Sequence, residues 1–267
     1  MCGIVAIINK THEIAEESLR DAVNALIPRG PDEQSSWFSA NRRVALGHAR
    51  LSIIDLTTGI QPIASEDGKL QIIHNGEFYD FERITSELES RGHKFRTKSD
   101  SEIALHLYKN LGVGCLEHLR GEFAFVIWDE DSQTLFAARD RFGIKPLFYV
   151  ETADGLRIAS EAKALFASGV EAAWDRESVF QNLFFSFDQD RTLFKNVRQL
   201  PPGHCLIARK GVVTIKRYWD VEYPFADGCH PHISETECIE SVRNLLDESI
   251  RLRMRADVPV GCYLSGG

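Results

Sequence analysis

The sequence of 267 residues has no apolar run long enough to cross a membrane. Its longest runs, such as 4–8 and 123–128, have the length of a strand, whereas a membrane helix needs about 20 apolar residues. No positively charged leader precedes the first run, so we expect no signal peptide and a cytoplasmic protein. A basic patch is lacking as well. The net charge is −8 and charges of both signs are interspersed, which argues against a nucleic-acid partner.

Cysteine is scarce and scattered, with six residues in the chain. A chain of this length, 43% apolar, can bury one sizeable core without disulfides, so we expect reduced thiols. One group, Cys229, His230, His232 and Cys238, could supply four metal ligands. Its spacing matches no common structural zinc pattern, and we predict no metal site there.

Short apolar segments separated by turn signals dominate the chain. We expect strands over 2–8, 44–51, 70–74, 123–129, 134–139, 147–150, 157–160, 206–209, 212–218 and 258–264. Helices are expected over 14–27, 81–91, 101–111, 161–167, 177–185 and 235–255. Strands follow one another and helices interrupt them in pairs, which favours an α+β fold of packed antiparallel sheets covered by helices.

The second residue, Cys2, is the most informative position. Its small side chain permits removal of Met1, which would leave a thiol and a free α-amine on one residue. A terminal α-amine titrates near pH ~7.7–8, and a cysteine thiol at about 8.5. One residue would then hold a nucleophile and its general base. Taken alone, Cys2 would more often be a small buried residue at the start of a strand.

Three short segments could complete a site that hydrolyses an amide through a thioester. Such chemistry needs donors for an oxyanion and groups that fix the substrate. The candidates are Gly47–Ser52, which presents an arginine at the end of a strand, Asn75–Glu77 after the strand 70–74, and Lys98–Asp100 at the start of a helix. Each alone could instead be a solvated arginine, a turn or a helix cap.

Combined with Cys2-Gly3-Ile4-Val5, these segments resemble the class II glutamine amidotransferases, whose glutaminase domain is an N-terminal-nucleophile hydrolase. The resemblance is closest to the glutamine-hydrolysing asparagine synthetases. Further matching segments are 29–32, 48–53, 75–79, 99–102, 121–125, 139–147, 160–165 and 200–203. The resemblance implies a four-layer αββα sandwich of antiparallel sheets over 1–215, a connecting segment over 216–234, and the first elements of an α/β synthetase domain over 235–267.

The resemblance also implies a role for each reactive residue. Cys2 would be the nucleophile, with its own α-amine as general base. The side-chain amide of Asn75 and the backbone N–H of Gly76 would form the oxyanion hole.

Glutamine would be held by its two charged ends. Arg50 suits bidentate capture of the α-carboxylate, and Glu77 and Asp100 would bind the α-ammonium. His48 and His74 neighbour these residues, but the α-amine makes a catalytic histidine unnecessary, so we interpret both as structural.

The end of the chain, 257–267, resembles the strand and first half of the pyrophosphate loop of ATP pyrophosphatases. Ser265, Gly266 and Gly267 would contact ATP through backbone N–H groups. The later ATP- and aspartate-binding residues are missing, so we expect a truncated chain. ATP and Mg²⁺ would serve the full-length enzyme, and the glutaminase half would need no cofactor.

The implied reaction of the full-length ligase converts glutamine, aspartate and ATP to asparagine, glutamate, AMP and pyrophosphate, with a homodimer as the possible assembly. Two alternatives stay open. A related amidotransferase could amidate another carboxylate, because acceptor specificity belongs to the missing domain. The chain could also be a catalytically silent regulatory domain if Met1 is retained, since Cys2 would then have no free amine.

Overall fold

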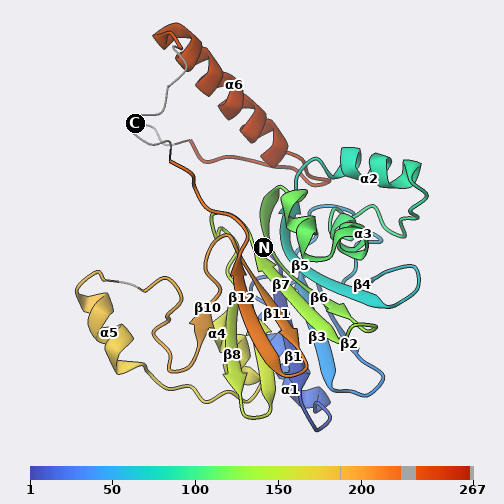
Figure 1. Ribbon diagram of the computed structural model, residues 1–267, viewed down its shortest axis with the longest axis vertical. Coiled ribbons are helices and arrows are strands. Elements are labelled where there is room, and N and C mark those ends of the chain that lie inside the picture. Colours follow the sequence, from blue (N-terminus) through green and yellow to red (C-terminus); the bar gives the residue numbers. More distant parts are fainter. Residues whose placement is uncertain (187, 224–232, 265–267) are drawn as a thin grey trace.

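The computed structural model of the protein describes residues 1–186, 188–223 and 233–264. Within these residues no helix combines the length and apolar character that a membrane crossing requires. The chain forms two six-stranded sheets. Within each sheet, every strand pairing that the structure describes is antiparallel. Figure 1 shows the sheets packed together, with helices on their outer sides.

The first sheet has the order β10-β8-β9-β1-β3-β2. Its strands are β1 (Gly3–Asn9), β2 (Glu33–Phe38), β3 (Val44–Arg50), β8 (Phe148–Thr152), β9 (Gly155–Ala159) and β10 (Arg198–Gln199). The apolar run of β1 is buried along nearly its whole length between β3 and β9. Because Gly3 pairs with Ala49, Cys2 is placed beside the end of β3.

The second sheet has the order β12-β11-β7-β6-β5-β4. Its strands are β4 (Ile63–Ala64), β5 (Leu70–Phe78), β6 (Gly121–Asp129), β7 (Thr134–Arg139), β11 (His204–Arg209) and β12 (Val212–Arg217). The strands expected over 206–209 and 212–218 are present as β11 and β12, which form a hairpin with Lys210 and Gly211 at positive φ in its turn.

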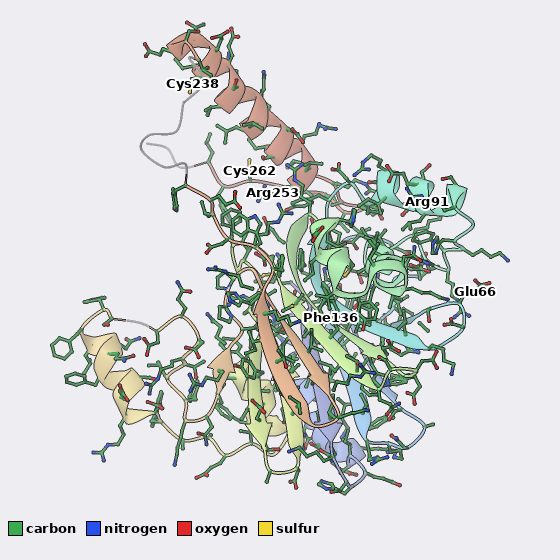
Figure 2. The ribbon with its side chains drawn as sticks, viewed as in Figure 1. Glu66, Arg91, Phe136, Cys238, Arg253 and Cys262 are labelled. Carbon is green, nitrogen blue, oxygen red and sulfur yellow. The ribbon has the colours of Figure 1, made fainter. Side chains whose placement is uncertain are left out.

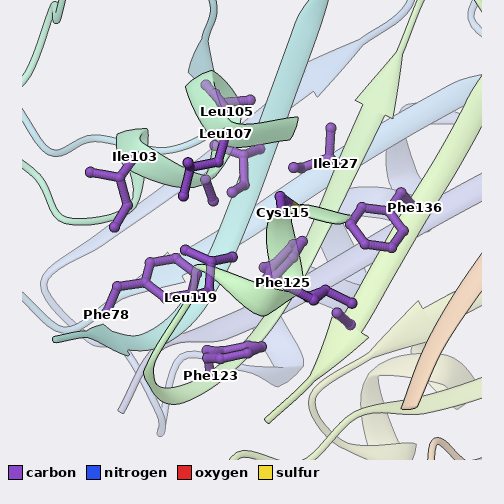
Figure 3. Close-up of a cluster of buried hydrophobic side chains, with 14 of the residues drawn as sticks. Phe78, Ile103, Leu105, Leu107, Cys115, Leu119, Phe123, Phe125, Ile127 and Phe136 are labelled. Carbon is purple, nitrogen blue, oxygen red and sulfur yellow. The ribbon is translucent and has the colours of Figure 1, made fainter. Parts of the chain in front are cut away.

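Three apolar clusters give the molecule its layers. One lies between the two sheets and includes Ile4, Ile73 and Leu206. A second joins the first sheet to α1 (Glu16–Ala25) and α4 (Ala162–Ala167). The third, shown in part in Figure 3, joins the second sheet to α2 (Phe81–Ser90), α3 (Glu102–Leu111) and the 3₁₀ helix η1 (Gly112–Glu117). The four-layer αββα arrangement is therefore confirmed.

The strand β5 is longer than the sequence indicates. The expected strand ended at residue 74, whereas β5 continues to Phe78 and pairs with β6 up to Gly121. Asn75–Glu77 therefore lies inside a strand and does not follow one. Gly76 at φ +150 and Gly121 at φ +157 let the two backbones approach where residues with a Cβ would clash.

Three other expectations differ from the structure. β2 was missed, because its sequence EQSSWF is largely polar and half exposed at the sheet edge. The strand expected over 258–264 is wrong, since these residues are in neither helix nor strand; no described strand lies beside them to accept their backbone hydrogen bonds. The alternative interpretation of 98–100 as a helix cap also fails, because no side chain caps α3 and Asp100 accepts from the Phe78 N–H instead.

The last two helices lie away from the layers in Figure 1. They are α5 (Arg176–Leu183) and α6 (Glu235–Arg253), and α6 begins with a capping box formed by Ser234 and Glu237. No residue of α6 is buried. Arg253, labelled in Figure 2, ends this helix and forms an ion pair of 2.8 Å with Glu122 of β6.

Candidate active site

Cys2 lies at the start of β1, at the edge of a small cleft. Its Sγ is held by the backbone of Leu51, at 3.4 Å from the N–H and 3.6 Å from the carbonyl oxygen. Arg29 donates from Nε to the Cys2 carbonyl at 2.8 Å and forms an ion pair of 2.9 Å with Glu161. These contacts fix the backbone on both sides of the thiol.

The cleft has a volume of about 60 Å³. It gathers residues from the chain before β1, from β3 and β5, from the loop after β3, and from the segments before α3 and β8. The lining residues are Met1, Cys2, Arg50, Leu51, Ile53, Ile54, Gly59, Gln61, His74, Asn75, Gly76, Glu77, Ser99, Asp100, Ser101 and Lys145. All six residues expected to handle glutamine are in this set.

The Cys2 thiol is poorly ionised in this form of the chain. Burial raises the pKa of the thiol above 9.0. The effect of burial outweighs that of the hydrogen bond from the Leu51 backbone, which lowers the pKa. The Met1 α-ammonium lies in the same cleft, and burial lowers its pKa below 8.0. A thiol with a raised pKa needs a base to become a nucleophile. An α-amine on Cys2, freed by loss of Met1, would be that base.

The side-chain amide of Asn75 is buried and unsatisfied. Asn75 is 0% exposed, and among the described residues neither Nδ2 nor Oδ1 has a hydrogen-bond partner. Such a group is costly unless a ligand satisfies it. Beside it, a Cβ on Gly76 would lie 2.0 Å from the carbonyl oxygen of Glu122. The position accepts only glycine, and the amide is available to an oxygen in the cleft.

Arg50 presents a fixed guanidinium from the end of β3. It is only 5% exposed, and its Nη2 donates to the carbonyl oxygens of Asp55 and Ile54. Its Nη1 is 3.7 Å from Glu33. Gly59 leaves room for the guanidinium, because a Cβ there would lie 2.7 Å from Nη2.

Two carboxylates face the cleft from the other side. Asp100 is 4% exposed and accepts a hydrogen bond of 2.7 Å from the Phe78 N–H. Burial, together with the nearby Glu77, raises the pKa of Asp100 to about 7, and burial also raises the pKa of Glu77. Neither forms an ion pair within the described residues. A ligand ammonium would supply the missing charge.

The two histidines near the cleft are neutral at pH 7. Burial lowers the pKa of His48 to about 4 and that of His74 to about 3. His48 Nε2 lies 3.2 Å from the His74 carbonyl, and His74 Nδ1 lies 2.8 Å from Ser101 Oγ. His74 also stacks on Phe78, with ring centroids 4.3 Å apart. These contacts support a structural role for both.

Sequence reasoning missed two residues that line the cleft. Gln61 accepts a hydrogen bond from the His74 N–H and donates one to Ser101 Oγ at 3.4 Å. It therefore links two other residues that line the cleft. The Lys145 Nζ lies 3.4 Å from Glu122 Oε2, and Lys145 adds a cation to the lining of the cleft. Lys145 belongs to one of the matching segments, but no local pattern indicates that its side chain reaches the cleft.

Two expectations fall on residues that the structure does not describe. Ser265, Gly266 and Gly267, expected to contact ATP, lie outside the described residues, as do residues 229–232 of the group for which we expect no metal. In the part of the chain that the structure describes, no group of three or more His, Cys, Asp or Glu side chains could hold a metal ion.

The αββα sandwich, with Cys2 directly before β1 at the edge of the cleft, is the arrangement expected of an amidotransferase domain. The family model described as a glutamine amidotransferase domain matches residues 1–219. The chain therefore belongs to the glutamine amidotransferase family. A second model, described as asparagine synthase, matches residues 241–267.

Relatives match the chain along its whole length. It is 43% identical to amidase chry2 of Gibberella zeae and 39% identical to amidase chyE of Penicillium rubens. It is 36% identical to the glutamine-hydrolysing asparagine synthetase 1 of Bacillus subtilis. The chain spans 41% of the length of the two amidases and 42% of that synthetase.

The fold also matches solved structures. A glutamine phosphoribosylpyrophosphate amidotransferase from B. subtilis, complexed with ADP and GMP, aligns with a TM-score of 0.62. The alignment covers 82% of this chain and 49% of that one at 22% identity. At this identity the likeness concerns the fold alone.

Proposed function

We propose that this chain hydrolyses glutamine to glutamate and ammonia through a thioester on Cys2. The unpartnered, fully buried amide of Asn75, in one cleft with the Cys2 thiol, carries the proposal. The Arg50 guanidinium and the carboxylates of Glu77 and Asp100 line the same cleft. They complement the two charged ends of a free amino acid, and this favours glutamine over an amide within a peptide.

The reaction starts when the free α-amine of Cys2 accepts the thiol proton. The thiolate attacks the side-chain carbonyl carbon of glutamine, and the resulting oxyanion accepts hydrogen bonds from Asn75 Nδ2 and the Gly76 N–H. The α-ammonium then protonates the departing nitrogen, which leaves as ammonia. Water, deprotonated by the same amine, attacks the thioester, releases glutamate and restores the thiol.

For the whole protein we propose glutamine-dependent asparagine synthesis, in which ATP and Mg²⁺ activate aspartate in the domain that follows. The match of residues 241–267 to the asparagine synthase model supports this. Identities of 36%, 35% and 33% to three B. subtilis asparagine synthetases support it as well. The ATP site would include Ser265, Gly266 and Gly267.

A second candidate is an amidotransferase that acts on a carboxylate other than aspartate. The higher identities of 43% and 39% to the two fungal amidases favour it. Incubation of the whole protein with glutamine, ATP and a panel of carboxylic acids distinguishes the two functions. Asparagine formation coupled to AMP release supports the first, and AMP release only with another acid supports the second.

The glutaminase site is tested by intact mass before and after exposure to an electrophilic glutamine analogue. We expect loss of the mass of Met1, followed by a single adduct that is absent from Cys2→Ala. We also expect Cys2→Ala to abolish glutamine hydrolysis while the fold stays intact. Retained Met1 without an adduct would instead favour the silent regulatory domain, and normal hydrolysis by Cys2→Ala would refute the thioester.

A further inference from the structure

The segment after α6 is hydrogen-bonded to the loop that follows β3. The Asp257 N–H donates to the Ile53 carbonyl at 2.9 Å, and Asp257 Oδ2 accepts from the Asp55 N–H at 2.8 Å. Arg255 holds the carboxylate from its other side, with Nη1 2.7 Å from Asp257 Oδ1. The same Arg255 is anchored to Glu82 of α2 at 2.8 Å. A residue more than 200 positions away thus contacts the loop through backbone and side chain.

Asp55 connects this contact to the cleft. Its carboxylate accepts from the N–H groups of Thr58 and Lys98, each at 2.9 Å. Its carbonyl oxygen accepts from Arg50 Nη2. Burial raises the pKa of Asp55, but the hydrogen bonds from Thr58 and Lys98 outweigh it and hold the pKa below 3.8. Asp55 therefore joins three parts of the site by hydrogen bonds: the Arg50 guanidinium, Thr58 in the loop after β3, and Lys98 in the segment before α3.

The backbone of Asp55 needs support to keep this geometry. Its φ is +52, in the left-handed region, which costs a residue with a Cβ more than it costs glycine although Asp is among the residues that adopt it. Asp257 supplies the acceptor for the N–H of that residue. Without it, the peptide before Asp55 loses this hydrogen bond, and the conformation of Asp55, which sets where its carbonyl meets Arg50, is less restrained.

We propose that Asp257 is a positioning residue for the α-carboxylate of the substrate, acting through Asp55 on Arg50. The inference rests on glutamine being the substrate. Asp257 is not among the residues that line the cleft, and no hydrogen bond joins it to Cys2 or Asn75 among the described residues. Its loss should therefore weaken binding of the substrate and leave the chemical steps unchanged.

Other contacts of the C-terminal segment provide a matched control. Glu248 of α6 forms an ion pair of 3.3 Å with Arg120 and touches neither Asp55 nor Ile53. Glu248→Ala removes one carboxylate that joins this segment to the sandwich, as Asp257→Ala does, but leaves the loop untouched.

The test compares glutamine hydrolysis by Asp257→Ala, Asp257→Asn and Glu248→Ala. For Asp257→Ala we expect the KM for glutamine to rise about three- to tenfold, the range for losing one hydrogen bond, with kcat within about twofold. Asp257→Asn keeps an oxygen acceptor for the Asp55 N–H and should restore most of the affinity. Glu248→Ala should resemble the unmodified chain.

Two further measurements separate positioning from a general structural effect. With 4-aminobutyramide, which is glutamine without its α-carboxylate, Asp257→Ala should show no rise in KM. Exchange of the Asp55 amide hydrogen should accelerate in Asp257→Ala and not in Glu248→Ala. An unchanged KM for glutamine, or an equal rise with both amides, overturns the inference.

Failure of the inference can be told from failure of the proposed function. If Cys2→Ala abolishes hydrolysis while Asp257→Ala is unaffected, the glutaminase stands and the positioning role falls. If the unmodified chain hydrolyses no glutamine, calorimetry of glutamine binding to Cys2→Ala, with and without Asp257→Ala, replaces the KM comparison. Equal affinities, or no glutamine binding by either protein, overturn the positioning role.

Discussion

At the scale of single residues, the site depends on charges that its substrate completes. Arg50 is already held by backbone carbonyls, whereas Asp100 is buried without a cation. Burial raises the pKa of Asp100 from 3.8 to about 7. A bound ammonium favours the ionised carboxylate, so glutamine binding should lower this pKa and release a proton near neutral pH.

We therefore predict that affinity for glutamine falls as the pH drops below 7. At pH 6 a carboxyl group with a pKa of about 7 is ionised in only ~10% of molecules, so we expect about tenfold weaker binding than at pH 8. Calorimetry on Cys2→Ala measures binding without turnover. Asp100→Asn should bind glutamine weakly at every pH. A pH-independent affinity of Cys2→Ala would show that Asp100 does not titrate in this range.

The same pKa has a consequence for stability. Between pH ~4 and 7 the folded chain retains the Asp100 proton that the unfolded chain has lost, so this group's contribution to stability decreases as the pH rises through that window. At pH 8 the buried charge remains uncompensated, and Asp100→Asn removes it. We expect Asp100→Asn to raise the melting temperature at pH 8 by a few degrees and to have a smaller effect at pH 5, as measured by calorimetry.

At the scale of elements, β5 shows which features of the site the sequence reveals. The reactive residues could be named because Cys2, Arg50 and Asn75 stand in short segments typical of a family. The length of β5 could not be predicted from the sequence, because the hydrophobic pattern stops at His74. Its last four residues are held by pairing with β6, a contact between residues more than 40 positions apart. The contribution of Lys145 is hidden for the same reason.

The close approach of β5 and β6 makes a prediction for Gly76→Ala. The added Cβ would lie 2.0 Å from the Glu122 carbonyl oxygen and 2.7 Å from Phe123 Cα, so the strands must separate. We expect a loss of about 2–4 kcal/mol in the free energy of unfolding and a large loss of hydrolysis. Gly114→Ala, whose Cβ would meet only Leu111 at 3.8 Å, is the control in denaturant titrations. Equal stability of the two variants would show that the strands can adapt.

At the scale of the whole molecule, the sandwich and the C-terminal segment differ in what they contribute. The three apolar clusters use only residues up to Tyr218. By contrast, the apolar side chains of α6 are 51–62% exposed at Ile239, Val242, Leu245, Leu246 and Ile250. Nothing in the described part of the chain covers this apolar stripe. We infer that the segment from 233 onwards adds little to the stability of the sandwich.

A chain that ends after residue 219 should therefore fold and melt within a few degrees of the longer one, because its core is intact. It lacks Asp257, however, so the loop that holds Arg50 loses its C-terminal contact. We expect the shorter chain to form the Cys2 adduct and to show the raised KM for glutamine of Asp257→Ala. Melting curves and glutamine hydrolysis of the two chains decide the matter. A stable short chain with an unaltered KM would mean that the loop keeps its conformation unaided, and a short chain that unfolds would mean that α6 is part of the folding unit.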